Sequence, residues 1–548
     1  MFRQNKKHLQ TNLFALQNSL PETLQKEILK SEEYAFYELI FCNIREEDFS
    51  VLYSDTPSRP NSSVNCLVSA LILKQKFNWT YQQLFKSIKF DLLTKTALGI
   101  YNLGEVPFDE STMYNFQNRL VGYQVETGIA LLEQVFDNLT AEQIKQLKLK
   151  TDIQRTDSVM ASSNIRGYSR TQLLIEVIQR LWRILDQDDT ELYKSEFAHY
   201  INKTSGQYIY KLNAKDISSE LEKISVLYHF CKHNILPKYK DRDIAKIFER
   251  VYNENFTEVE SKIEVKDSKE LNSSCLQSPD DVDATYRQKR GMGYRGQSIN
   301  IVETASKENP VNLITDISVN PNNIDDAQVL NQRLDKMKAK TPDLNELHAD
   351  GAYGNPDVDE KCDKHDIELI QTAIRGNMSE VPIEIVELFE GNYQVNCPFQ
   401  SVVSELSGKR FKCYFNKEIC NACPNLSKCP ASARKQGMVY SFTHGDYLRN
   451  KRLVRVLSLP PEKRKIRANV EATMKEFAYR MPNKKLKVRG ACKANLFAFL
   501  TGIAINFGRI YRFKSSKPPK LAIKVTKVAV SFWLFVQSRK KLQIILDF

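Results

Sequence analysis

A chain of 548 residues is too long for a single compact core, so several domains are expected. Its 42% apolar and 26% charged residues are ordinary for a soluble globular protein and argue against a globally disordered chain. The formal net charge of +13 makes nucleic acid the first partner to consider, although a basic soluble enzyme of another kind fits the charge equally well.

Neither end of the chain has the pattern of an export signal or a membrane span. The first ten residues, MFRQNKKHLQ, lack an apolar core and a small-residue cleavage site. Near the C-terminus, the apolar stretch LAIKVTKVAVSFWLFV carries Lys524 and Lys527, whose charges make a membrane span costly. We therefore expect no membrane partner and a reducing, cytoplasmic environment, in which clusters among the eleven cysteines indicate metal ligands before disulfides.

Residues 1–140 are predicted to form a helical N-terminal domain. In residues 64–88, apolar side chains recur at three- and four-residue spacings, and Asp109 or Ser111 can cap a later helix. Short helices joined by tight turns fit a DNA-binding bundle of the helix-turn-helix type. A plain helical cap on the main domain is the alternative.

Strand patterns and helical patterns alternate in the middle of the chain. One long strand or a strand pair is predicted in residues 145–165, and a helical insertion with a linker in residues 166–284. A hairpin follows in residues 292–320, then a helix, a short strand ending at Asp350, a short helix and a further strand. This order predicts a mixed α/β sheet built from residues 145–165 and 285–378.

The C-terminal third divides into three predicted segments. Residues 379–445 hold five cysteines and form a Cys-rich insertion, residues 446–512 are predicted to be helical, and residues 513–548 are a basic and apolar tail. The pattern is helical over PPEKRKIRANVEATMKEFAYRM, and the pair Pro460-Pro461 fits a helix start, because the first turn of a helix does not need the missing N–H.

Three carboxylates stand out by their context. Asp157 lies inside a predicted strand, Asp350 ends a strand before Gly351, and Glu471 lies on the predicted C-terminal helix. The glycine is expected to let the backbone turn sharply and leave the carboxylate exposed at the sheet edge. Three carboxylates converging from two strands and a helix suit Mg²⁺ or Mn²⁺, which prefer oxygen ligands.

Other acidic residues compete for this role, since most of the 66 acidic side chains must lie on the solvated surface. Asp152 is five residues before Asp157, so on one strand the two face opposite sides and only one can point to a shared site. Asp316 and Asp109 are weaker candidates.

The combination of motifs resembles insertion-sequence transposases of the DDE superfamily. The matching pieces are TDSVMASSNI, HADGAYGNPD, RKIRANVEATMKEF and RGACKANLFAFLTGIAINFGRI, preceded by a helical segment that includes DESTMYNFQNRL. The resemblance covers residues 60 to about 512, and the order of the motifs is more specific than any one of them. It implies a ribonuclease H-like core, with Asp157, Asp350 and Glu471 as the catalytic and metal-binding triad.

The resemblance also implies the chemistry and the partners. Two Mg²⁺ or Mn²⁺ ions in the active site would support cleavage of DNA at the ends of a mobile element and joining of the 3′-OH ends to target DNA. A homodimer on paired ends, in a prokaryotic cytoplasm and associated with the nucleoid, is expected. Two rivals are a nuclease of the same fold without strand transfer and an inactive, transposase-derived DNA-binding protein.

Basic residues near Glu471 are the expected DNA contacts. Arg467 and Lys475 lie one helical turn before and after it, and Arg464 precedes them in the same basic stretch. The family's Arg before Glu falls on Arg467, which would contact the DNA backbone or orient the carboxylate. Many relatives have Tyr and Lys where this chain has Arg464 and Ala478, so the DNA-end contacts of those two side chains are not expected here.

The Cys-rich segment predicts a structural zinc site. Its CxxC pair, Cys420 and Cys423, is followed by Cys429, and either Cys397 or Cys413 would complete four thiolates around Zn²⁺. Related transposases carry Cys-Pro at the position of Cys397, so the resemblance favours Cys397.

Three histidines were considered as ligands. His348, two residues before Asp350, would share its face on a strand, although a lone histidine is more often structural. His229 and His233 have the i, i+4 spacing that can bind a metal. Because the sequence near them does not place a glutamate as zinc proteases do, they are interpreted as helix-surface or core residues.

Overall fold

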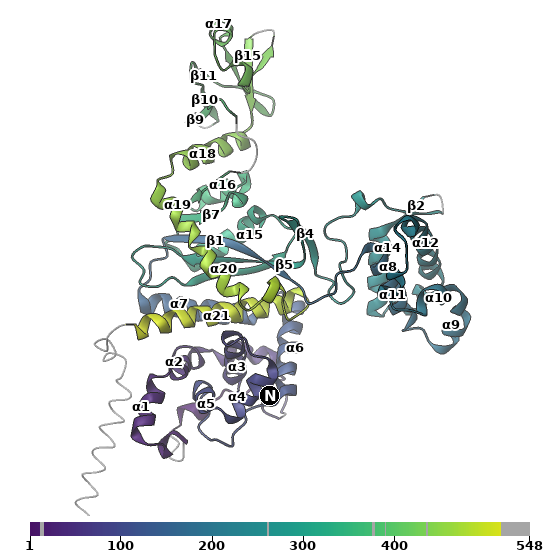
Figure 1. Cartoon of the computed structure of the whole chain (residues 1–548). Coiled ribbons are helices and arrows are strands. Elements are labelled where there is room, and N and C mark those ends of the chain that lie inside the picture. Colours follow the sequence, from purple (N-terminus) through teal and green to yellow (C-terminus); the bar gives the residue numbers. More distant parts are fainter. Residues whose placement is uncertain are drawn as a thin grey trace, which may run out of the picture.

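The computed structural model in Figure 1 describes residues 1–516, with the exception of 11–15, 58, 260–261, 375–378, 390 and 435–436. The fold is mixed α/β: a central sheet is covered by helices, and two further regions project away from it (Figure 1). Of the predicted basic and apolar tail, residues 517–548 lie outside the described residues.

The N-terminal region is helical, as predicted. Its helices are α1 (Glu22–Lys30), α2 (Glu32–Leu39), α3 (Val64–Lys76), α4 (Tyr81–Phe90), α5 (Leu92–Ala97), α6 (Glu110–Thr127) and α7 (Leu131–Leu147). The apolar periodicity of residues 64–88 corresponds to α3 and α4. Asp109, rather than Ser111, caps α6 by accepting a hydrogen bond from the backbone N–H of Thr112 at 2.7 Å. The helices α2 to α7 share one hydrophobic core with the sheet and with the long C-terminal helix α21 (Ala491–Ser515).

The central sheet has six strands. They are β1 (Ile153–Ser162), β4 (Thr285–Lys289), β5 (Met292–Thr304), β6 (Ile314–Pro321), β7 (Glu346–Ala349) and β8 (Glu368–Gln371). The predicted strand near Asp157 is one long strand, β1, and the predicted hairpin is β5–β6. Strands β1, β5 and β6 pair antiparallel, whereas β1, β7 and β8 pair parallel.

Alternate residues of the strands pack into two separate hydrophobic cores, one on each face of the sheet. In β5, Ile301 packs into the core shared with α21 and the N-terminal helices. Its neighbour Val302 packs on the opposite face, against α15 (Asp326–Lys340) and the strand β7. The sheet is therefore covered on both faces. The helix α16 (Pro356–Lys364) adds to the second layer.

A helical region lies between β1 and β4 and has a core of its own. Its elements are α8 (Arg170–Trp182), α9 (Gln187–Leu192), α10 (Lys194–Ile201), α11 (Ser205–Tyr210), α12 (Ile217–Asn234), α13 (Leu236–Tyr239), α14 (Asp243–Asn255), β2 (Phe256–Val259) and β3 (Lys262–Val265). Figure 1 shows it projecting to one side of the sheet. The antiparallel β2–β3 pair was not predicted from the sequence.

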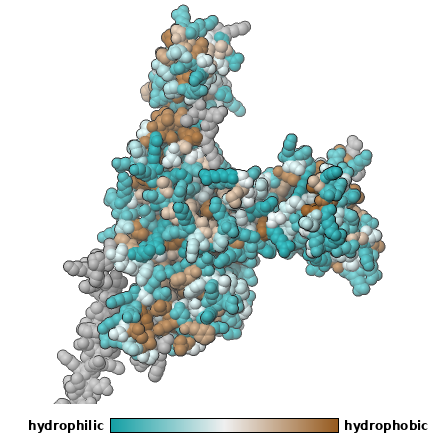
Figure 2. Space-filling view, in the orientation of Figure 1, coloured by the Kyte–Doolittle hydropathy of each residue, from teal (hydrophilic) through white to brown (hydrophobic). Residues whose placement is uncertain are grey.

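The Cys-rich region projects at the top of Figure 1 and is built of short strands. They are β9 (Glu384–Phe389), β10 (Asn392–Asn396), β11 (Ser401–Val403), β12 (Glu405–Ser407), β13 (Arg410–Phe415), β14 (Ser432–Arg434) and β15 (Gly437–Phe442), with the helix α17 (Lys417–Asn421). The helix α18 (His444–Ser458) leads from this region back towards the sheet (Figure 1). Figure 2 shows that hydrophilic side chains predominate on the visible face, with apolar ones gathered over parts of the N-terminal helices.

The helix start predicted at Pro460-Pro461 is confirmed, and the helical stretch that follows is divided into two helices, α19 (Pro461–Ala468) and α20 (Val470–Ala478). The carbonyl of Ile466, which a continuous helix would offer to Val470, instead accepts a hydrogen bond from Arg155 Nη1 at 3.1 Å. Asn469 lies at the junction, and asparagine is a weak helix former. A side chain of the sheet therefore contacts the C-terminal end of α19.

The helix α21 is the only one in the described part of the chain that is long and apolar enough to cross a membrane. It lies against α3, α7 and β6, and 72% of its most apolar stretch is buried inside the protein. Such burial is typical of a core helix.

Candidate active site

Two of the predicted carboxylates lie close to one another at the sheet: Asp157 is on β1, and Asp350 directly follows β7, which pairs parallel with β1. The pairing of β1 with β7 sets Arg155 opposite His348, so two residues further along each chain Asp157 and Asp350 are level with one another. Arg467 reaches both: its Nη2 atom is 3.1 Å from Asp157 Oδ2 and 3.8 Å from Asp350 Oδ2. One guanidinium thus joins two carboxylates that are 193 positions apart in the sequence, counting from 157 to 350.

Both aspartates are oriented by the backbone. Asp157 Oδ1 accepts a hydrogen bond from the N–H of Ser158 at 2.8 Å, and Asp350 Oδ1 accepts one from the N–H of Ala352. Burial raises the pKa of Asp157, and the charge of Asp350 raises it further, against the opposing effects of the Ser158 N–H and Arg467. A cation bound beside Asp157 would offset the cost of ionising this buried carboxyl.

The glycine after Asp350 is needed for close packing. A Cβ atom on Gly351 would lie 2.5 Å from the carbonyl oxygen of Ala373, which no real contact tolerates. The backbone of Gly351 is not in the left-handed region, so the predicted reason, conformational freedom, is wrong. The turn that exposes Asp350 is instead fixed by a neighbouring loop.

Replacing Gly351 by alanine is expected to push this turn away from Ala373 and displace Asp350. We expect a loss of about 1–3 kcal/mol in the free energy of unfolding, as for other overpacked sites, together with a loss of DNA cleavage. Urea unfolding and a cleavage assay measure the two effects. Gly104→Ala is the control, since nothing lies within 4 Å of its added Cβ. Equal stability of both variants would contradict the packing argument.

Glu471 lies in the first turn of α20, on the stretch that follows Arg467. The buried side chains Val470 and Phe477 fix α20 against the sheet, where it packs on β1, while Glu471 itself is exposed. The structure brings Asp157, Asp350 and Arg467 together. It does not place Glu471 within a tight ligand group with the two aspartates.

The other predicted DNA contacts, Arg464 and Lys475, are both exposed. Arg464 Nη2 donates to the carbonyl of Val456 at 3.3 Å. These two side chains lie on α19 and α20, the helices that carry Arg467 and Glu471. Two basic side chains are therefore open to solvent on the helices that carry the other site residues.

A buried ion-pair network, which was not predicted, ties α20 to the sheet. Glu303 of β5 is fully buried and accepts hydrogen bonds from Arg155 at 2.7 Å, Arg509 at 2.7 Å and Thr473 at 2.6 Å. These partners belong to β1, α21 and α20. A glutamate inside the apolar run INIVETA was the available signal, because a buried charge must be paired.

A fourth acidic residue near the site was also missed. Asp326, in the first turn of α15, is 4% exposed and lies 3.8 Å from Arg287 Nη2. Burial raises its pKa, and the charge of Asp350 adds to the effect. Asp326 therefore belongs to the electrostatic surroundings of the two aspartates.

The competing acidic residues have structural roles. Asp316 is buried between Arg333 and Lys340; burial opposes ionisation, but these cations hold its pKa below the usual range. Asp152 lies just before β1, and its backbone carbonyl accepts hydrogen bonds from the N–H groups of Asn345 and Glu346, each at 3.0 Å. Neither carboxylate points to Arg467, as Asp157 does.

His348 is completely buried, and its Nε2 lies 2.5 Å from Glu346 Oε1. Lys463 binds the second oxygen of the same glutamate. The histidine thus joins a buried cluster beside the site.

The four favoured cysteines lie together in the Cys-rich region. Cys397, Cys420, Cys423 and Cys429 line one small cavity with apolar neighbours such as Ile419 and Leu426. Burial raises the pKa of the Cys420 thiol, and the charges of the other three add to this. Cys413 is fully buried in β13, opposite Tyr440, and does not line the cavity.

The thiols are near one another but are not in a closed ligand shell. In the described residues, only His229, His233 and Glu258 form a group of three candidate ligand atoms within 4.8 Å of one another. Binding Zn²⁺ would require the four sulfur atoms to close around it.

These features define a basic α/β protein with paired aspartates at adjacent strands of its sheet, beside helices that carry a glutamate and basic residues. Residues 394–511 match the family model described as "Transposase DDE domain", and no curated protein and no solved structure matches the chain. The match supports a DDE-superfamily transposase, the family that the sequence motifs resemble. It includes Glu471 and Arg467, while Asp157 and Asp350 precede the matched segment.

DDE transposases generally use divalent metal ions. The donor set at the sheet is consistent with this: carboxylate oxygens are the ligands that Mg²⁺ and Mn²⁺ prefer, and Asp157 and Asp350 already share a cationic partner in Arg467.

Proposed function

We propose that this protein is a transposase that cleaves DNA at the ends of a mobile element and joins the 3′-OH ends to target DNA. The observation that carries the proposal is the meeting of Asp157 and Asp350 at Arg467, with Glu471 on the next helix. The match of residues 394–511 supports the same reading.

In this proposal Asp157, Asp350 and Glu471 hold two Mg²⁺ or Mn²⁺ ions, which when bound supply activation of the attacking oxygen and stabilisation of the leaving oxygen. Arg467 contacts both aspartates and balances their charge. Once cations take over that role, its guanidinium is free to bind a DNA phosphate. The break between α19 and α20 gives Glu471 a pivot from which to approach the aspartates.

The domain division follows from the same proposal. The core is ribonuclease H-like, a proposal supported by a sheet in which the antiparallel strands β6, β5 and β1 continue into the parallel strands β7 and β8. The N-terminal helices recognise element ends, and the exposed Arg464 and Lys475 contact the DNA backbone. The active assembly is a homodimer on paired ends.

A strand-joining assay tests the proposal against its two rivals. DNA that flanks the gene on both sides supplies the element ends, and a labelled 3′-OH end reports joining to a plasmid in Mg²⁺. We expect cleavage followed by joined products. Cleavage without joining would identify a nuclease, and binding without cleavage would identify an inactive DNA-binding protein; either result would overturn the proposal.

We also propose that Cys397, Cys420, Cys423 and Cys429 bind one structural Zn²⁺. Cys420→Ser is expected to lower the zinc content, measured by atomic emission on the purified full chain, by about one ion per chain. Cys413→Ser is the matched control and should retain its zinc, because that side chain lies away from the shared cavity. Loss of zinc from Cys413→Ser and not from Cys420→Ser would reverse the assignment.

A further inference from the structure

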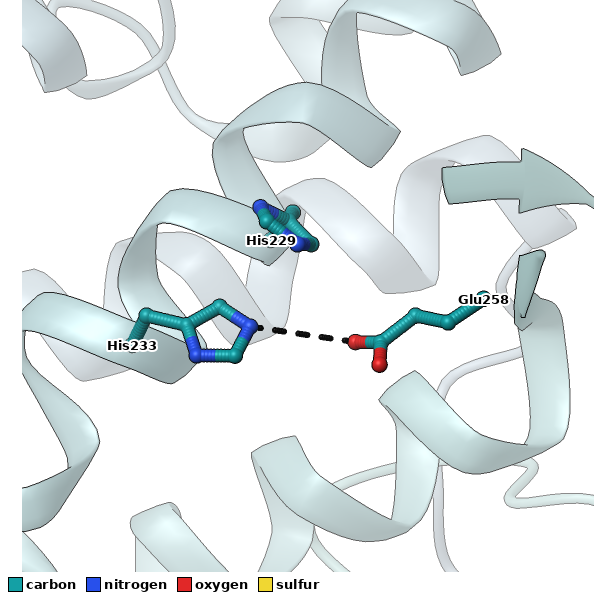
Figure 3. Close-up of side chains that lie close together, drawn as sticks. All are labelled: His229, His233 and Glu258. Atoms are coloured by element: carbon teal, nitrogen blue, oxygen red, sulfur yellow. Dashed lines mark ion pairs between the residues drawn. The ribbon is translucent and has the colours of Figure 1, made fainter. Parts of the chain in front are cut away.

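The helical region between β1 and β4 carries a third cluster of metal-ligating side chains, separate from the aspartates and the cysteines and built from two elements. His229 and His233 lie on α12, and Glu258 lies on the strand β2 (Figure 3). One ligand atom from each residue lies within 4.8 Å of the other two. The sequence indicated only the two histidines at i, i+4 spacing. The carboxylate belongs to Glu258, which is 25 residues after His233.

The distances between these side chains suit a metal ion bound by all three. The two imidazole rings have centroids 4.5 Å apart, and His233 Nε2 is 3.8 Å from Glu258 Oε1. Figure 3 shows His233 and the carboxylate of Glu258 facing one another, with His229 beside the gap. The side chains of His233 and Glu258 are 54% and 38% exposed, so an ion from solvent has access.

Glu258 is held in place by other groups. The hydroxyl of Tyr252 donates a hydrogen bond to Oε1, and Lys232 Nζ lies 2.9 Å from the same oxygen. Lys232 also lies 4.1 Å above the ring of Tyr252. One carboxylate oxygen is thus fixed by two donors, whereas no contact of Oε2 is seen among the described residues.

We propose that His229, His233 and Glu258 bind one divalent transition-metal ion of the Ni²⁺, Co²⁺ or Zn²⁺ type. Two imidazole nitrogens and one carboxylate oxygen are a ligand set for these ions, and they leave further positions for water. The ion links α12 to the β2–β3 pair, which packs against that helix. Its role is to stabilise the helical region, because an ion that binds only the folded form adds its binding free energy to folding.

Lys232 provides a second way to test the proposal. Its ammonium group is the cation that balances Glu258 without metal, so it competes with an incoming ion. Removing it should strengthen metal binding, whereas a merely structural ion pair would predict no change.

Isothermal titration of the tag-free full chain with NiCl₂, in excess Mg²⁺ to occupy oxygen-rich sites, tests this. Wild type is expected to bind one Ni²⁺ per chain more than the His229→Ala/His233→Ala variant. Glu258→Gln should weaken that site at least tenfold, and Lys232→Ala should strengthen it severalfold. Any nickel bound by the cysteines is the same in wild type and in these variants, so it does not affect the differences between them.

His199→Ala is the matched control. His199 is an exposed histidine of the same region that lies 3.7 Å from a glutamate, Glu220, and belongs to no such group of three. It should bind nickel as wild type does. Equal nickel binding by wild type and the double-histidine variant would overturn the proposal, and so would full affinity in Glu258→Gln or an unchanged affinity in Lys232→Ala.

Discussion

Asp350→Asn is expected to lower the rate of DNA cleavage in Mg²⁺ about a thousandfold or more, which corresponds to ~4 kcal/mol of lost transition-state stabilisation. The amide keeps the shape of the side chain and can still accept the hydrogen bond from the Ala352 N–H. It removes the negative charge that Arg467 now balances and that a divalent ion would need. The loss should therefore appear in the rate, with little change in folding.

The control for this experiment is Asp357→Asn. Asp357 is an exposed carboxylate in the first turn of the nearby helix α16 and lies outside the contacts around Arg467. Cleavage by this variant should match that of wild type. Initial rates on flanking element DNA, with circular dichroism to verify folding, give the comparison. A folded Asp350→Asn protein with wild-type activity would remove Asp350 from the mechanism.

Glu303→Ala is expected to lower the free energy of unfolding by about 3–5 kcal/mol, because it leaves buried arginines without their shared anion. Arg155 and Arg509 both contact Glu303, and their side chains are 8% and 13% exposed. Thr473 loses its acceptor as well, so α20 is no longer tied to β5. We expect DNA cleavage to fall too, since α20 carries Glu471.

Urea unfolding measures this effect, with Glu308→Ala as the control. Glu308 pairs with Lys150 on the surface, where the pair is 69% and 50% exposed, and such pairs contribute about 0–1 kcal/mol. A Glu303→Ala protein within 1 kcal/mol of wild type would show that the network does not hold α20 in place.

Much of the fold could be predicted because its signals are local. The β5–β6 hairpin has two apolar runs around a polar turn, and α15 has helical periodicity, so each is found within a short window. The strand β4, with the sequence TYRQK, was missed because it is short and polar and is formed by pairing with β5. Its existence depends on the neighbour more than on its own residues.

The break between α19 and α20 could not be predicted for a different reason. It depends on Arg155, which is 311 positions before Ile466 and reaches that carbonyl only once the sheet has formed. The contacts of the candidate active site also depend on residues that are far apart in the sequence. Sequence motifs indicated Asp157 and Asp350 separately, but their shared contact with Arg467 and the nearby Asp326 follow from strand pairing.

The histidine cluster also includes a partner residue that the local sequence does not indicate. The spacing of His229 and His233 predicts one face of a helix, yet nothing near them in the sequence indicates a carboxylate partner. Glu258 reaches them because β2 follows α14 back towards α12.

The central claim is that Asp157, Asp350 and Glu471 form one metal site, although among the described residues their ligand atoms do not all lie within 4.8 Å of one another. Anomalous scattering from crystals grown with Mn²⁺ and element-end DNA measures this directly. We predict manganese peaks at roughly 2.0–2.6 Å from carboxylate oxygens of all three residues, with Arg467 moved off Asp157. Manganese bound at the aspartates with Glu471 still turned to solvent, or no manganese at the sheet, would contradict the account.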